Sequence, residues 1–181
     1  RQYDIDFAAQ LPHGPLRVYV MGDRGANREP ATQRDIERMA ALTTESIKSG
    51  ALGFSTSRTL NHQTADGQPT PTLSAELGEM VGIAEGVKNA GSGVMQVVTD
   101  FKGNDSEFEI LKEMTKQSDR PLSVSVAQHH RVTNGWRNIL RTIEDANKEG
   151  LKLTAQVCGR PIGVLIGLEL TNHPFSAHPS L

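Results

Sequence analysis

The sequence predicts an α/β fold in which parallel strands alternate with helices. Short apolar runs rich in valine end at glycine or at polar residues, and between them apolar side chains recur at helical spacing over about a dozen residues. Strands joined by such helices pair in parallel. The pattern allows a complete doubly wound sheet or five-eighths of a (β/α)8 barrel, and a whole barrel needs about 250 residues. The chain has 181 residues.

The composition is that of a globular domain and excludes several classes of partner. The net charge is −2, with acidic and basic residues interspersed, so we expect no nucleic-acid binding. No apolar run is long enough to cross a membrane. Cys158 is the single cysteine, which excludes a disulfide within the chain and indicates a reducing compartment such as the cytoplasm. The oligomeric state is left open.

Three elements are predicted before residue 60. Leu16–Met21 is a run of β-branched, aromatic and aliphatic residues that ends at a glycine and is typical of a strand. A helix follows from Thr32, whose hydroxyl can cap it together with Asp35 in a capping-box position, and Gly50 ends this helix. Leu52–Ser57 is the second predicted strand.

A long polar loop, residues 58–72, follows the second strand, and its His62 could fold over a site as part of a lid. Asp66-Gly67 favours a turn within this loop. The remaining helices have apolar stripes that include Met80, Leu111 and Leu140, and the last of these helices begins near Asn134. The remaining predicted strands are Val94–Thr99, Leu122–Ala127 and Leu151–Val157.

Polar side chains follow the predicted strands and would gather at one rim, because parallel strands end at the same edge of a sheet. We expect Arg58, and also Arg24 and Arg160, to hold a substrate carboxylate, since a guanidinium can donate two parallel hydrogen bonds to it. Ser57 and Gln96 would hydrogen-bond an acyl or amide group. The alternative interpretation is that these residues are the solvated ends of strands.

Candidate acid–base and metal-binding residues are few. Asp100 is a candidate general base, or else it caps the following turn. His129-His130 lies at a strand end, where neighbouring side chains point in different directions, so at most one imidazole would face a central site. A metal held there needs further ligands from elsewhere, and the chain contains no His-x-His motif.

Several blocks of sequence occur in a consistent order along most of the chain. They are Pro12-His-Gly-Pro-Leu-Arg-Val-Tyr-Val-Met-Gly22, Glu29-Pro-Ala-Thr32 and Ser49-Gly-Ala-Leu-Gly-Phe-Ser-Thr-Ser-Arg58. These blocks resemble the D-aminoacylase (N-acyl-D-amino-acid deacylase) branch of the amidohydrolase superfamily. Thr64-Ala-Asp-Gly67 and Arg160-Pro-Ile-Gly-Val-Leu-Ile-Gly167 resemble stretches from other members of that branch.

The resemblance implies a partial (β/α)8 barrel of a metal-dependent hydrolase. Members cleave the amide of an N-acyl-D-amino acid, with a zinc ion that polarises the carbonyl and lowers the pKa of a bound water, and with a late aspartate as base. The first-strand His-x-His, that aspartate and a small β-domain would lie outside residues 1–181. We therefore expect the chain to be a fragment of one catalytic domain that is inactive alone.

The resemblance also implies two metal ligands inside this chain. One would be a histidine near Val98, where the sequence has none, so Gln96 or Asp100 would substitute or that ligand is lost. The other lies in a Ser-His-His-Lys-like stretch that Gln128-His-His-Arg131 resembles after a slip of about three residues, which makes His129 the candidate ligand. A one-metal site, or none, follows from this pattern.

The function that we expect is hydrolysis of an amide C–N bond in a small acylated amino acid or a similar amide. The alternative is a metal-free barrel homologue that works as a non-enzymatic binding or assembly component, which the missing histidine near Val98 favours.

Overall fold

The computed structural model contains one five-stranded sheet in which all strands run parallel and follow the chain order β1-β2-β3-β4-β5. It describes residues 4–101, 105–128, 133–163, 165, 167–170, 173, 175 and 178–179. This sheet confirms the α/β prediction, and β3 has the predicted bounds. The strands are β1 Leu11–Pro12, β2 Gly53–Arg58, β3 Val94–Thr99, β4 Leu122–Ser125 and β5 Leu153–Gln156.

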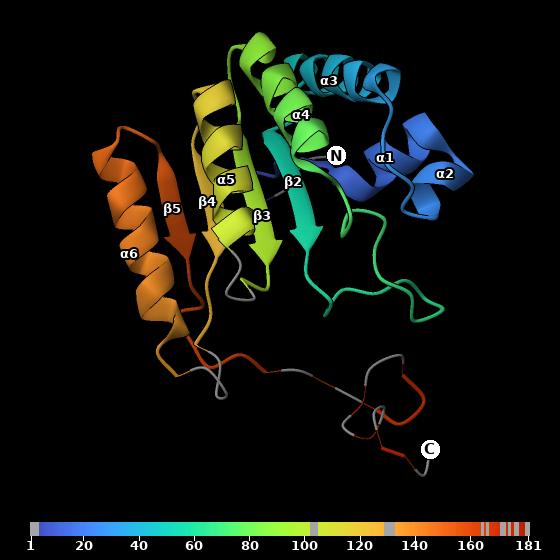
Figure 1. Ribbon diagram of the computed structural model, residues 1–181, viewed down its shortest axis with the longest axis vertical. Coiled ribbons are helices and arrows are strands. Elements are labelled where there is room, and N and C mark those ends of the chain that lie inside the picture. Colours follow the sequence, from blue (N-terminus) through green and yellow to red (C-terminus); the bar gives the residue numbers. More distant parts are fainter. Residues whose placement is uncertain are drawn as a thin grey trace.

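The helices cover one face of the sheet, and the carboxyl ends of the strands gather at one edge, the lower one in Figure 1. The loop after β2 lies at that edge, and α1 and α2 lie beside β2 at the end of the sheet that holds β1. The helices are α1 His13–Met21, α2 Asp23–Ala26, α3 Gln33–Lys48, α4 Leu77–Ala90, α5 Asp105–Ser118 and α6 Gly135–Lys148.

The strand predicted at Leu16–Met21 is wrong, because this segment belongs to helix α1. The chain makes only a two-residue strand, Leu11–Pro12, before the helix begins. The buried residues of α1 include His13, Leu16 and Arg17, whose spacing is helical. Burial of this stripe outweighs the local preference of valine and tyrosine for strands. Arg24, predicted to follow a strand, consequently lies in the short helix α2.

The predicted start of helix α3 is confirmed. The Asp35 amide donates to the Thr32 hydroxyl over 3.3 Å, and the Thr32 amide donates to the Asp35 carboxylate over 2.8 Å. These two bonds form the capping box that the sequence predicts.

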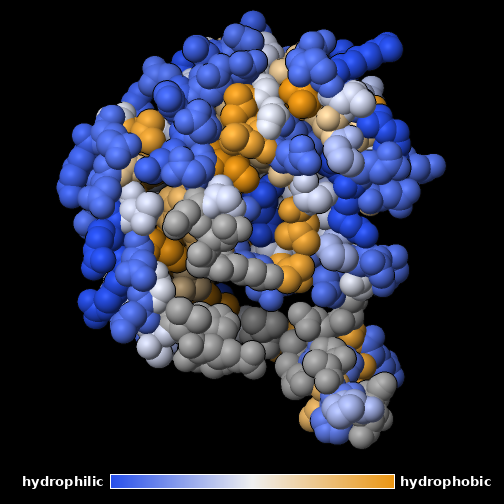
Figure 2. Space-filling model, viewed as in Figure 1, coloured by the Kyte–Doolittle hydropathy of each residue, from blue (hydrophilic) through white to orange (hydrophobic). Residues whose placement is uncertain are grey.

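The two faces of the sheet differ sharply in chemistry. Residues that point toward the helices are buried and mostly apolar, among them Phe54, Met95, Val97, Leu122, Val124 and Leu153. The opposite face is polar, and Ser55, Gln96, Ser123 and Thr154 lie side by side across four strands. Figure 2 shows the helix-covered side, whose surface is largely hydrophilic with apolar groups between the helices. A parallel sheet normally has both faces covered, and in a (β/α)8 barrel the face opposite the helices lines the interior.

Helices α3 and α4 approach closely at Gly86. A Cβ at this position would lie 2.4 Å from the carbonyl oxygen of Ala40 and 3.0 Å from the Cβ of Thr43. The hydroxyl of Thr44 donates to the Gly86 carbonyl over 2.8 Å, which further fixes the helix pair. Only glycine fits this contact without separating the helices.

We therefore predict that Gly86→Ala lowers the free energy of unfolding by about 1–3 kcal/mol through overpacking. Gly78→Ala on the same helix is the matched control, because its Cβ would meet nothing closer than 3.9 Å. Alanine there should leave stability unchanged or raise it by up to about 1 kcal/mol. Urea unfolding measures both variants, and equal effects would contradict the close helix contact.

Candidate active site

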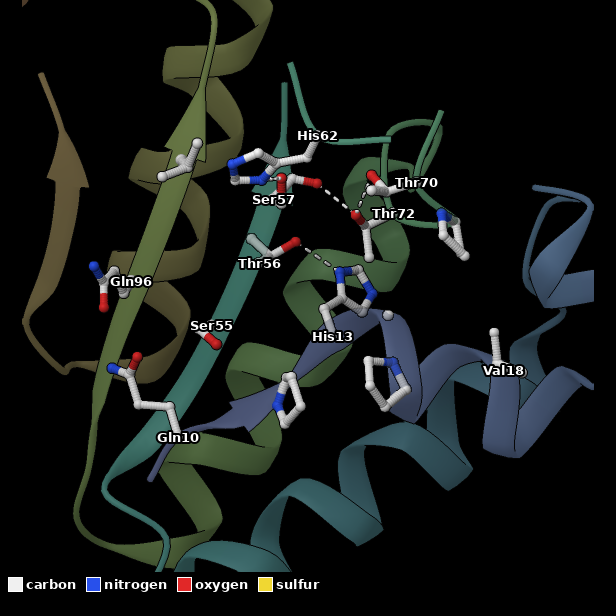
Figure 3. A pocket seen from close by; sticks show the side chains of 15 residues that line it. Gln10, His13, Val18, Ser55, Thr56, Ser57, His62, Thr70, Thr72 and Gln96 are labelled. Carbon is white, nitrogen blue, oxygen red and sulfur yellow. Dashed lines mark hydrogen bonds between the residues drawn. The ribbon is translucent and has the colours of Figure 1, made fainter. Parts of the chain in front are cut away.

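An open pocket of about 700 Å³ lies where β1, β2, β3 and helix α1 meet the loop after β2. Figure 3 shows its walls: Ser55, Ser57 and Gln96 come from the strands, His13 and Val18 from α1, and His62, Thr70 and Thr72 from the loop. The volume of this pocket and its mixed polar and apolar lining are typical of a site that binds a small molecule. The pocket therefore lies at the carboxyl ends of parallel strands, where α/β proteins bind ligands.

One wall of the pocket rests on a buried cluster of polar side chains. His13 Nε2 lies 2.8 Å from a carboxylate oxygen of Glu79 on α4, and Arg17 Nε donates to the same oxygen over 2.9 Å. His13 Nδ1 lies 2.8 Å from the Thr56 hydroxyl on β2. These contacts join α1, α4 and β2 behind the pocket.

The charge states of this cluster follow from its burial. Burial lowers the pKa of His13 and outweighs the raising effect of Glu79, so the imidazole is neutral near pH 7. Burial alone would raise the pKa of Glu79, but the hydrogen bonds from His13 and Arg17 and the positive charge of Arg17 outweigh it and lower the pKa. An ionised carboxylate only accepts hydrogen bonds, so the His13 proton sits on Nε2. Nδ1 consequently accepts the hydrogen bond of the Thr56 hydroxyl.

Arg17 also binds the segments that enclose the pocket. Its guanidinium donates to the carbonyl oxygens of Gly25 over 3.1 Å and Pro71 over 3.0 Å, and it also donates to the carbonyl of Glu29. Arg17 is fully buried. One side chain therefore ties α1 to the loop after β2 and to the connection that leads into α3.

Arg58 forms a second buried anchor. Its guanidinium donates two hydrogen bonds to the Glu107 carboxylate, Nε over 2.9 Å and one terminal nitrogen over 2.8 Å, and its other terminal nitrogen donates to the carbonyl of Ala75 over 2.7 Å. The Thr99 hydroxyl donates to the same carboxylate. Burial alone would raise the pKa of Glu107, but Arg58 and Thr99 lower it. This pair holds the ends of β2 and β3 against α5.

The structure brings two of the predicted site residues into the pocket, Ser57 and Gln96. The Ser57 hydroxyl lies 2.6 Å from Nδ1 of His62, and the Gln96 amide donates to Gln156 over 3.0 Å. Asp100 instead accepts hydrogen bonds from the Thr59 hydroxyl and from the Leu60 amide, the latter over 3.0 Å. Asp100 therefore holds the start of the loop.

The three predicted arginines do not line this pocket. Arg58 is engaged by Glu107, and Arg24 of α2 pairs with Asp35 over 3.0 Å. Arg160 is exposed and donates to its neighbour Pro161. His129, predicted as a metal ligand, lies outside the described residues.

Sequence reasoning missed the cluster of His13, Arg17 and Glu79. The signal was present, because His13 and Arg17 are four residues apart and would share one face of a helix. The same segment also has the composition of a strand, and that pattern hid the helical spacing.

The described residues contain no group of three or more His, Cys, Asp or Glu side chains able to hold a metal ion. Val98, near which a histidine ligand was implied, lines the pocket with an apolar side chain. Among the same residues, none of the helices has the length and apolar character that crossing a membrane requires.

Comparisons with known proteins agree with this architecture. The sequence matches the Amidohydrolase family over residues 4–181. No curated protein matches it. Three structures of D-aminoacylase match at 23% identity, and each match covers 80% of this chain and 28% of the other. One of them concerns the binuclear metal centre of that enzyme and another is a mutant in complex with CuCl2, each with a TM-score of 0.59. The third has a TM-score of 0.57. The sheet is therefore part of a (β/α)8 barrel, and the chain spans 28% of the length of these structures.

We predict that Glu79→Gln lowers the free energy of unfolding by about 3–5 kcal/mol, because it leaves the buried Arg17 charge without a counter-charge. Glu85→Gln on the same helix is the control, since Glu85 is exposed and should change stability by less than about 0.5 kcal/mol. Urea unfolding compares the two variants. A loss for Glu79→Gln no larger than the control would contradict the role of the cluster.

A second prediction concerns pH. Because the folded protein keeps His13 neutral, protons bind more readily to the unfolded chain below about pH 6.5, the ordinary histidine pKa. The free energy of unfolding should therefore fall between pH 7.5 and pH 5.5, by at most about 1.4 kcal/mol per pH unit from this residue. Glu79, whose pKa is lowered, contributes a further loss in the free energy of unfolding only below about pH 4.5.

Urea unfolding at several pH values measures this slope in the parent and in His13→Gln. The variant should show a shallower pH dependence over the same range, because glutamine does not titrate. Parallel slopes would show that His13 is not the group responsible.

Proposed function

We propose that this chain, which belongs to the amidohydrolase family, forms the substrate-binding part of a barrel hydrolase that cleaves the amide C–N bond of a small acylated amine. The observation that carries the proposal is the pocket with mixed polar and apolar lining at the carboxyl ends of the strands. Gln96 and Ser57 lie on its strand wall and offer amide and hydroxyl groups that suit an amide bond. Pro15, Val18 and Val98 supply apolar contact for an acyl chain.

N-acyl-D-amino acids are the substrates that we propose first, because the solved neighbours are D-aminoacylases. Such a substrate carries a carboxylate, which needs a cation or amide donors nearby. Arg58 and Arg24 already form ion pairs with Glu107 and Asp35, respectively. Arg160 is exposed and forms no ion pair with a described residue, so it stays our candidate for the carboxylate.

Zinc is the metal implied by the family resemblance, and the described residues do not fit a metal centre. They offer no cluster of three ligating side chains, and Val98 cannot donate to a cation. A metal in the whole protein would need at least some ligands from residues outside the described ranges, such as His129.

A second candidate function is a barrel that binds a small amide without hydrolysing it. Val98 favours this function, because it is an apolar pocket residue close to where the resemblance implies a metal ligand. The two functions share the pocket and differ in turnover.

The test is release of free amine from a panel of N-acyl-D- and N-acyl-L-amino acids by the whole protein. We expect turnover of at least one member, and Gln96→Leu should lower kcat/KM about tenfold through loss of one hydrogen bond. Thr154→Val is the control, since Thr154 lies on the same sheet face but outside the pocket. Saturable binding without turnover would select the binding function, and neither binding nor turnover would contradict both.

A further inference from the structure

One end of the Gln96 side-chain amide is already engaged by another glutamine. Gln96 Nε2 donates to Oε1 of Gln156 over 3.0 Å, and Gln96 lines the pocket whereas Gln156 does not. We propose that this bond leaves the Gln96 carbonyl oxygen to the ligand, so that Gln96 selects molecules that carry an N–H group and Gln156 is its positioning residue. This inference deepens the proposed function and rests on it for the substrate class.

The bond between the two glutamines spans a whole strand. Gln96 belongs to β3 and Gln156 to β5, and β4 lies between them. The β4 residues in register with them are Ser123, beside Gln96, and Ser125, beside Gln156. Neighbouring strands lie about 4.8 Å apart, so two long side chains can meet above a middle strand that carries small residues. The two serines of β4 provide this space.

The direction of this bond decides what Gln96 can offer to a ligand. A glutamine amide has donors on its nitrogen and acceptors on its oxygen, so fixing one end fixes the other. With Nε2 directed at Gln156, Oε1 of Gln96 remains an acceptor, and no donor among the described residues reaches it. The N–H of a secondary amide would satisfy this oxygen. An ester would place a second lone pair against it, and a tertiary amide would place a carbon there.

The rest of the pocket favours selection by hydrogen bonding over selection by charge. Among the described residues that line it, none is Asp, Glu, Lys or Arg. Burial lowers the pKa of the lining residue His13, so this imidazole is neutral near pH 7. A site that offers a neutral acceptor discriminates strongly against a ligand that lacks the matching hydrogen, because its own polar group is then left unpaired.

The glutamine pair lies on the sheet face that is turned away from the helices. In a (β/α)8 barrel this face lines the interior, which bulky branched side chains usually fill. Here the register places Ser55, Gln96, Ser123 and Thr154 side by side across it. A polar layer at this position keeps hydrogen-bonding groups beside the pocket, and enclosure by the whole barrel would strengthen the bonds that they form.

Calorimetric titration of the whole protein tests this selection with a pair of ligands that differ in one group. The first is N-methylsulfonyl-D-alanine, which keeps the N–H, and the second is the sulfone in which CH2 replaces that NH. Neither contains an amide bond, so binding is measured without turnover. We expect the sulfonamide to bind at least about tenfold more tightly than the sulfone.

Variants at the two glutamines should change the ratio of the two affinities in a defined way. Gln96→Leu should bring the ratio close to one. Gln156→Glu should keep the ratio, because a carboxylate still accepts the Nε2 hydrogen. Gln156→Lys offers only donors, so it should turn the Gln96 amide around and lower the ratio about tenfold. A merely structural role for Gln156 would weaken both ligands together and leave the ratio unchanged.

Thr154→Val is the matched control, because Thr154 lies on the same sheet face but outside the pocket. It should keep the ratio of the parent protein. Thermal unfolding should show that all variants are folded, so that a changed ratio reports on the amide group of Gln96.

Equal affinities in the parent, a preference that survives Gln96→Leu, or binding of neither ligand overturns the selection by Gln96. Amide hydrolysis by such a protein would leave the proposed function standing. An unchanged ratio in Gln156→Lys overturns the positioning role of Gln156. A preference that disappears in Gln96→Leu, in a protein that hydrolyses no amide, has the opposite meaning, since the selection stands and the proposed hydrolysis fails.

Discussion

The buried carboxylate of Glu79 is the group on which this architecture depends. It accepts hydrogen bonds from His13 and Arg17 at once, so that one negative charge satisfies two donors of helix α1. Neutral His13 accepts a hydrogen bond from the Thr56 hydroxyl, and Arg17 donates one to the carbonyl of Pro71 in the loop. Because the charges of Arg17 and Glu79 cancel, a fully buried polar layer joins sheet, helices and pocket wall without an unpaired charge.

The regular parts of the fold could be predicted from the sequence, and the long-range pairs could not. The strand Val94–Thr99 follows from its valines between glycine and aspartate, and the start of α3 follows from Thr32 and Asp35. Helix α1 was missed, because its strand-like composition hid the helical spacing of His13 and Arg17, and their partner Glu79 lies over sixty positions away. The pairing of Arg58 with Glu107 could not be predicted either, since the two residues lie 49 positions apart and no local pattern links them.

The residues of the candidate site come from separate segments of the sequence and meet only in the folded chain. Ser57 and Gln96 were predicted from their places near strand ends, whereas the contact between Ser57 and His62 depends on how the long loop folds back. The family match and the D-aminoacylase neighbours agree on a barrel. Val98 gives the pocket of this chain an apolar side chain near the place of an implied ligand.

The mutual satisfaction of His13, Arg17, Thr56 and Glu79 limits how this protein can change over evolutionary time. Each member leaves a stranded donor or acceptor behind if it alone is replaced. Drift at these four positions should therefore be concerted: related chains should either keep the whole quartet or exchange it together for an apolar set of similar volume. Correlated substitution at positions so distant along the chain would follow from the contacts within this one cluster.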